Sequence, residues 1–120
     1  MNIEQLYEFC LSKKAVSEHF PFDLDILVFK VGGKIFCLTS LKDWENAMPS
    51  LNLKCDPIYA IALREKYESV TPGYHSNKKH WNTVFVNKEI EDKKMFHFIN
   101  HSYELVVAGL TKKEREILKN

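Results

Sequence analysis

The chain has 120 residues, 45% of them hydrophobic, and its 17 basic and 16 acidic side chains leave a formal net charge of +1. A chain of this length forms one ordinary domain that buries roughly 65% of the surface its unfolded form exposes. The balanced charge excludes a global field that would draw the protein onto nucleic acid or a membrane, so any electrostatic function must be local.

The first predicted element is a helix. Asn2 with Gln5 three residues on is typical of a capping pair, and apolar residues then recur at helical spacing, which extends the helix to about Lys14. Pro21 disfavours helical backbone at the residue before it, so the chain ends or changes direction there.

The stretch ILVFKVGGKIFCLTS predicts a tight β-hairpin. Two β-rich runs flank Gly32 and Gly33, which supply the positive φ angles that a two-residue turn requires. In a regular register Phe29 lies opposite Phe36. We then expect Leu27, Phe29, Phe36 and Leu38 on the core face, and Val28, Lys30, Ile35 and Cys37 on the other face.

Further elements follow in the second half of the chain. Residues 50–55 alternate apolar and polar, as a half-buried strand does. Asp56 as cap and Pro57 as first residue predict a helix to about Tyr67. A second hairpin is expected at residues 74–86, with Tyr74 and His75 leading into a turn at residues 76–79. We favour burial of Trp81 in the core, because large aromatic residues on alternating strands usually pack inward.

The last third of the chain is predicted to be helical. From about Glu91 the apolar positions follow the helical period, and Gly109 is a suitable end. Thr111 and Glu114 then form a capping box for a short terminal helix. The sequence contains no internal repeat or linker, so we expect a single domain over residues 1–120.

The cysteines and histidines do not predict a metal or a catalytic site. Cys10, Cys37 and Cys55 are odd in number and lack a C-x-x-C spacing. Cys55 precedes a helix start, which favours a thiolate, but it alternates in phase with buried leucines, which favours an inert thiol. His19, His75 and His80 lack a zinc-site spacing. We therefore expect no metal, no cofactor and no enzymatic activity.

The cellular setting is predicted from what the sequence lacks. Free thiols fit a reducing cytosol, the first residues show no basic region followed by an apolar run, and no stretch approaches the ~20 apolar residues of a membrane span. We expect a soluble cytoplasmic protein without a membrane partner. A monomer is compatible with this composition.

Local basic charge points to nucleic acid. Residues 26–88 carry nine basic and five acidic groups, a surplus of +4. Phosphate-seeking, stacking and hydrogen-bonding groups meet in the second hairpin, and the first hairpin adds two more lysines. These candidates are Lys78, Lys79, His80, Trp81, Asn82, Lys30 and Lys34. The alternative is that the lysines only solubilise the surface or protect sheet edges from aggregation.

Several segments together resemble the MmcQ/YjbR family of small bacterial proteins. The matching segments are FPF at 20–22, VFKVGGKIF at 28–36, LKCDP at 53–57, ALREKY at 62–67, PGYHSNKKHWN at 72–82 and SYELV at 102–106. The resemblance implies an α+β fold of the frataxin-like or double-wing kind. In this fold a twisted antiparallel sheet of about five strands, with two hairpins as wings, packs against helices.

The resemblance also implies DNA as a partner, because the fold is similar to a DNA-binding domain of a phage transcription factor. The positions that match the family's motifs add Lys54 to the seven candidates above, with lysines on phosphates and Asn82, together with Trp81 if exposed, on bases. Frataxin-like proteins handle iron through acidic helices, but the first helix here carries only Glu4 and Glu8. The competing hypothesis is a protein-interaction or small-ligand module whose groove is lined by Tyr74, His75, His80 and Trp81.

Overall fold

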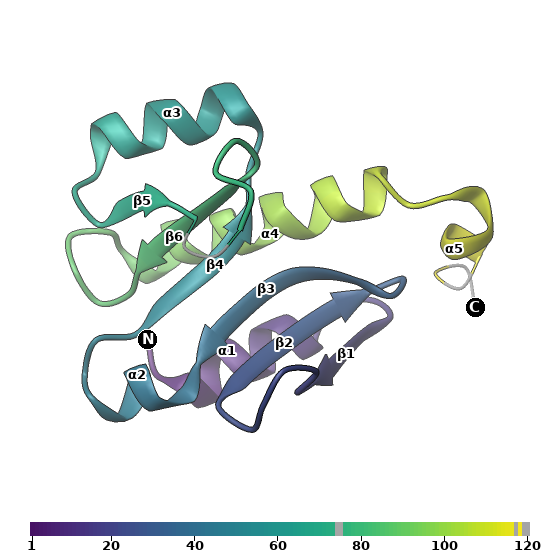
Figure 1. Ribbon diagram of the computed structural model, residues 1–120, viewed down its shortest axis with the longest axis horizontal. Coiled ribbons are helices and arrows are strands. Elements are labelled where there is room, and N and C mark those ends of the chain that lie inside the picture. Colours follow the sequence, from purple (N-terminus) through teal and green to yellow (C-terminus); the bar gives the residue numbers. More distant parts are fainter. Residues whose placement is uncertain (74–75, 117, 119–120) are drawn as a thin grey trace.

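The computed structural model describes residues 1–73, 76–116 and 118, and these form a six-stranded antiparallel sheet and five helices (Figure 1). The strands are β1 (Val16–His19), β2 (Ile26–Val31), β3 (Lys34–Ser40), β4 (Ser50–Lys54), β5 (Val70–Pro72) and β6 (Trp81–Phe85). The helices are α1 (Ile3–Leu11), α2 (Leu41–Glu45), α3 (Pro57–Lys66), α4 (Asp92–Ala108) and α5 (Lys112–Glu116). The predicted α+β class is confirmed, with six strands in place of about five.

Helices α1, α3 and α4 pack against one face of this sheet. Buried side chains such as Leu6 of α1, Leu63 of α3 and Ile99 of α4 join the strand residues in a single core. Figure 1 shows α1 and α4 passing behind the strands, and α3 lying along the β5–β6 edge. The strand order is β1-β2-β3-β4-β6-β5, so β6 lies between β4 and β5.

The sheet face turned away from these helices is called the open face below. Residues paired across neighbouring strands point to the same face, and successive residues of a strand alternate. One paired row on the open face runs across all six strands and consists of His19, Val28, Leu38, Asn52, Thr83 and Thr71. Lys30, Ile35, Lys54, Trp81 and Phe85 lie in phase with this row on their strands.

The β2–β3 hairpin has the predicted turn but not the predicted register. Gly32 and Gly33 have φ angles of 59° and 79°, as a tight turn requires. The register then shifts, so that Phe29 lies opposite Cys37 and Phe36 is the extra residue of a β-bulge. The expectation for the two faces is therefore wrong at two positions: Cys37 points into the core and Leu38 to the open face.

The first edge strand was not predicted. α1 ends at Leu11, short of Lys14, and Ala15 adopts a positive φ of 61° before β1 begins. β1 pairs antiparallel with β2 but is half-buried only at Val16 and exposed at its other residues. A short polar edge strand has no apolar alternation, which is why its sequence does not distinguish it from a loop.

The helix ends follow the predicted capping chemistry. Asn2 and Gln5 form a reciprocal capping box, each side chain accepting a backbone N–H of the other at 2.8 Å. The Asp56 carboxylate accepts the N–H groups of Ile58 and Tyr59, both at 3.1 Å, and Pro57 begins α3. Among the described residues no helix is long and apolar enough to cross a membrane.

Strands β3 and β4 separate where α4 inserts a hydroxyl group between them. They are paired at Cys37–Leu53 and Leu38–Asn52. Beyond this point Ser102 of α4 donates to the Phe36 carbonyl oxygen at 2.5 Å and accepts from the Lys54 N–H at 2.8 Å. Ser102 thus bridges two strands that no longer pair with each other, and a hollow between them is lined by open-face residues such as Lys54 and Trp81 and also by Val106 and Gly109 of α4.

Candidate binding site on the open sheet face

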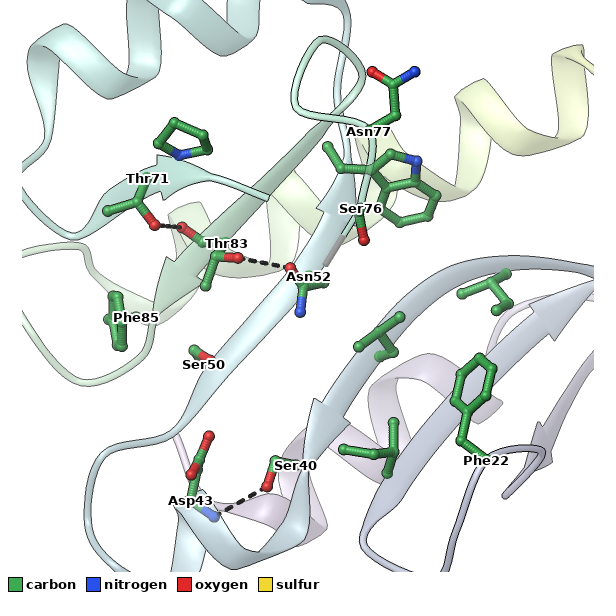
Figure 2. Close-up of a pocket in the computed structure, with 15 residues that line it drawn as sticks. Phe22, Ser40, Asp43, Ser50, Asn52, Thr71, Ser76, Asn77, Thr83 and Phe85 are labelled. Atoms are coloured by element: carbon green, nitrogen blue, oxygen red, sulfur yellow. Dashed lines mark hydrogen bonds between the residues drawn. The ribbon is translucent and has the colours of Figure 1, made fainter. Parts of the chain in front are cut away.

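The open face contains a groove of about 950 Å³ between the β1-β2-β3 and β4-β6-β5 parts of the sheet (Figure 2). Ligand pockets in proteins span roughly 300–1,000 Å³, so the groove is large enough for an organic molecule. Its walls mix aromatic and aliphatic side chains with neutral polar ones. They comprise Phe22, Ile26, Ile35, Leu38, Ser40, Asp43, Ser50, Asn52, Thr71, Pro72, Ser76, Asn77, Trp81, Thr83 and Phe85.

A line of hydrogen bonds orients the polar groups of the groove. Thr71 Oγ1 donates to the Thr83 carbonyl oxygen at 3.3 Å, and Thr83 Oγ1 donates to Asn52 Oδ1 at 2.6 Å. Because the Asn52 oxygen is held by Thr83, its Nδ2 amide points away from Thr83 into the groove (Figure 2). Within the described residues this amide has no hydrogen-bond partner, so Asn52 offers a fixed donor to a ligand.

Three of the predicted lysines gather at the hollow beside the groove. This second hollow, of about 440 Å³, is lined by Lys30, Gly33, Lys34, Ile35, Lys54, Trp81, Val106 and Gly109. Trp81 and Ile35 also line the groove, so the two spaces share these walls. The separation of β3 and β4 around Ser102 brings Lys34 of one strand and Lys54 of the other to the same hollow.

With the residues that the structure describes, these lysines form no close ion pair. In the described part of the chain the single ion pair joins the N-terminal ammonium group to Asp92, at 3.1 Å. The pKa of Glu114 is lowered, mainly by hydrogen bonding from the Thr111 N–H and to a smaller extent by the positive charge of Lys34. Lys30 and Lys54 are half-buried, which strengthens their field relative to fully solvated ammonium groups.

Lys78, Lys79 and His80 lie on the turn that leads into β6. Asn77 organises this turn, because its side chain accepts from the Lys79 N–H and its carbonyl oxygen from the Trp81 N–H, both at 2.9 Å. Both lysines are exposed and His80 is half-buried, and none of the three lines the groove or the lysine hollow. The turn therefore places two further cations beside Trp81.

Trp81 was expected in the core and Asn82 at the surface, and the structure places them the other way round. Trp81 is half-buried and lies on the open face, so the expected burial of Trp81 in the core is wrong. Asn82 is 2% exposed and belongs to the paired row Cys37–Leu53–Asn82, which points to the helices. Its side chain is thus covered, and the expectation that Asn82 contacts bases is corrected.

Asn82 instead anchors α3 by accepting a hydrogen bond from Arg64, a residue whose structural role the sequence did not indicate. Arg64 Nε donates to Asn82 Oδ1 at 2.7 Å, and Arg64 Nη2 donates to the carbonyl oxygens of Lys78 and Trp81. One guanidinium group thus ties the basic turn to the helix. The match of ALREKY to a family motif was the signal at Arg64, but only the fold shows its partners.

The structure gives no support to chemistry at cysteine or histidine. Cys55 is buried, and burial raises the pKa of its thiol to about 11, so the thiolate expected of a nucleophile is disfavoured. Among the described residues no group of three or more His, Cys, Asp or Glu side chains is placed to hold a metal ion. Tyr74 and His75, which belonged to the alternative groove, lie outside the described residues.

The groove donors themselves were missed. Asn52 and Thr83 occur in the sequence as ordinary polar residues of alternating strands, where solvent exposure is the normal expectation. The alternation does not place them on one face, because Thr83 is in phase with Trp81, which was expected in the core, whereas Asn52 is a polar position of its half-buried strand. Only the pairing of β4 with β6 brings the two side chains together.

Comparison with known proteins identifies relatives along the whole chain. A family model described as YjbR matches residues 11–105. Uncharacterized protein YbdF of Escherichia coli O157:H7 is 43% identical over 96 residues, which cover 80% of this chain and 76% of that protein. Uncharacterized protein YjbR of Escherichia coli strain K12 is 30% identical over 118 residues, 98% of each chain.

Solved structures share the fold. The crystal structure of Deinococcus radiodurans protein DR2400, which carries the DUF419 domain, matches with a TM-score of 0.87 and 36% identity over 98% of this chain and 88% of that chain. A crystal structure from Pseudomonas syringae matches with a TM-score of 0.73 at 24% identity, over 88% of this chain and 98% of that one, which supports the fold alone. The family model and the relatives together show that this chain belongs to the YjbR family.

Proposed function

We propose that this protein binds nucleic acid through the open face of its sheet. The observation that carries the proposal is the hollow in which Lys30, Lys34 and Lys54 lie together with Trp81. Ammonium groups neutralise phosphates, and an indole ring stacks on a base. The exposed Lys78 and Lys79 extend this basic surface along the turn next to Trp81.

The electrostatics support local rather than long-range attraction. The net charge of +1 provides little steering, so affinity depends on the few cations that touch phosphates. If these five lysines each neutralise a phosphate, log affinity for a single strand falls by roughly 3.5 for each tenfold rise in salt. Micromolar binding at low salt that disappears near physiological salt is the expected behaviour.

The groove favours a second candidate function, binding of a small organic ligand. Its volume and its mixture of aromatic walls with a fixed Asn52 donor are typical of ligand pockets. Of the two described residues of the earlier groove hypothesis, His80 and Trp81, only Trp81 lines the groove. The groove and the lysine hollow are adjacent, so the two candidate functions involve the same region of the protein. Binding experiments with different ligands distinguish them.

The test is fluorescence anisotropy of labelled single-stranded and double-stranded DNA at two salt concentrations. The Lys30→Glu, Lys54→Glu double variant should lose at least tenfold in affinity, because each substitution replaces an attraction to phosphate with a repulsion. The Lys88→Glu, Lys93→Glu variant is the matched control, since it makes the same charge change at two exposed lysines outside the groove and the hollow. Absence of binding at low salt, or equal losses in both variants, would refute the proposed surface.

A further inference from the structure

We infer that the groove receives the base of one unpaired nucleotide while the adjoining lysine hollow holds its phosphate. This inference rests on the proposed function and makes it more specific, because it assigns the protein to single strands rather than duplexes. The chemistry recognised is a planar, hydrogen-bonding ring joined to a phosphate. Its source is either a free nucleotide or a nucleotide within a single strand, and the experiment below separates the two.

The shape of the open face carries the first step. Readout of duplex DNA through the major groove uses a convex element, a helix or a two-stranded ribbon, that fits into that groove. Here the aromatic and polar side chains instead line a concavity of about 950 Å³. A concave site accepts a base only when that base is unstacked and extended from the strand, as in single-stranded recognition.

The groove lining carries the second step. Trp81 lies at the boundary of the groove and the hollow, where an indole can stack on a base whose phosphate extends towards the lysines. Asn52 presents its Nδ2 donor from the floor, oriented by the 2.6 Å hydrogen bond from Thr83. Neutral donors and acceptors of this kind are suited to base edges, which carry ring nitrogens and carbonyl oxygens.

The distribution of charge fixes the direction of the ligand. Among the described residues that line the groove, Asp43 is the one that carries a charge, and it lies with Ser40 at the opposite end from Ser76 and Asn77 (Figure 2). The Trp81 N–H bonds the Asn77 carbonyl oxygen, and Trp81 pairs with Lys54, so the lysine hollow adjoins the Asn77 end. A ligand therefore keeps its phosphate at the lysines, away from Asp43, and extends its base from there towards Asn52.

The experiment is an amide-resolved NMR titration of the full chain with adenosine 5′-monophosphate, adenosine and inorganic phosphate, each separately. We expect the nucleotide to shift the Trp81 indole N–H and the Asn52 side-chain amide, and phosphate alone to shift only signals of the hollow such as Gly33. Adenosine should bind at least tenfold more weakly than the nucleotide, because it lacks the charged group. Shifts by the nucleotide that spare both Trp81 and Asn52 would overturn the inference.

Variants separate base recognition from phosphate binding. Asn52→Asp keeps the shape and the acceptor for Thr83 but removes the donor, and Ser50→Phe fills the groove without touching a lysine. Each should weaken the nucleotide and a single-stranded adenine 12-mer about tenfold. The matched control is Asn46→Asp, an exposed position outside the groove, which should leave both affinities unchanged.

The last probe is a DNA hairpin duplex, whose affinity is compared with that of the single-stranded 12-mer. This comparison can refute base recognition while leaving the proposed nucleic-acid binding intact. We expect the duplex to bind at least tenfold more weakly than the 12-mer. Equal binding of duplex and single strand, unaffected by Asn52→Asp and Ser50→Phe, would overturn base recognition but support a nucleic-acid surface. Binding of the nucleotide without the 12-mer would support the groove site with free nucleotides as the source and overturn the proposed function. Absence of binding by the nucleotide, the 12-mer and the duplex alike would overturn both.

Discussion

The side-chain oxygen of Ser102 accepts a hydrogen bond from the backbone N–H of Lys54, 2.8 Å away. The same hydroxyl group donates to the Phe36 carbonyl oxygen, so one fully buried serine satisfies backbone groups of two strands that have separated. A buried backbone group without a partner is costly, and this arrangement allows the sheet to open without that cost. The lysine hollow lies beside this opening, between Ile35 of one strand and Lys54 of the other.

The first prediction concerns Ser102→Ala. Loss of the hydroxyl group leaves the Lys54 N–H and the Phe36 carbonyl without their partner, and we expect the free energy of unfolding to fall by about 2 kcal/mol. Urea denaturation measures this change. Ser17→Ala, on the exposed edge strand, is the matched control and should change stability by less than about 0.5 kcal/mol. Equal effects of the two substitutions would contradict the bridging role.

The second prediction concerns Arg64→Lys. A lysine keeps the charge but lacks the planar fork that reaches Asn82 and the carbonyl oxygens of Lys78 and Trp81 together. We expect a loss of about 1–3 kcal/mol in stability and faster hydrogen exchange at the Trp81 N–H, which closes the turn onto Asn77. Arg115→Lys, at an exposed arginine of α5, is the control. Unchanged exchange at Trp81 would show that the turn does not depend on Arg64.

The third prediction concerns Lys78→Glu combined with Lys79→Glu. The two lysines lie on the turn and not in the hollow, so we expect weaker binding of single-stranded DNA with base recognition retained. The slope of log affinity against log salt should become shallower by about 1.4, from two lost phosphate contacts. Anisotropy titrations at several salt concentrations measure this slope. An unchanged slope would confine the phosphate contacts to the hollow.

The fourth prediction concerns the thiols. Cys10, Cys37 and Cys55 are all buried, so a disulfide reagent at pH 8 should label none of them rapidly in the native protein and all three after denaturation. Burial raises the pKa of Cys55 from 9.0 to about 11, so the unfolded chain releases this proton at lower pH than the folded one. Stability from this group is therefore full below pH 9 and falls as the pH rises towards 11. Denaturation at pH 8 and pH 10.5, compared with Cys55→Ser, tests the sign.

Local chemistry in the sequence accounts for most of the fold. The capping box at Asn2, the Gly32–Gly33 turn and the Asp56–Pro57 start of α3 each depend on a few neighbouring residues, and each occurs where predicted. The periodicity of α4 and the alternation of β4 likewise required no long-range information. β1 was not predicted, because a polar edge strand is defined by its pairing with β2 and has no hydrophobic pattern of its own.

The sequence by itself thus determined the α+β class, the first hairpin, the strand at Trp81–Phe85 and the presence of lysines and an aromatic residue near the turns. The strand that pairs with Trp81–Phe85 is Val70–Pro72, which lies ahead of the predicted segment 74–86. Only the tertiary structure decided which of these residues meet. The bulge at Phe36 turned Leu38 to the open face, and the pairing of β4 with β6 turned Asn82 to the helices and Trp81 away from them. A shift of one residue in register reverses the face of a side chain, and register depends on partners distant in sequence. The hollow of Lys30, Lys34 and Lys54 depends in the same way on Ser102, 48 residues from Lys54.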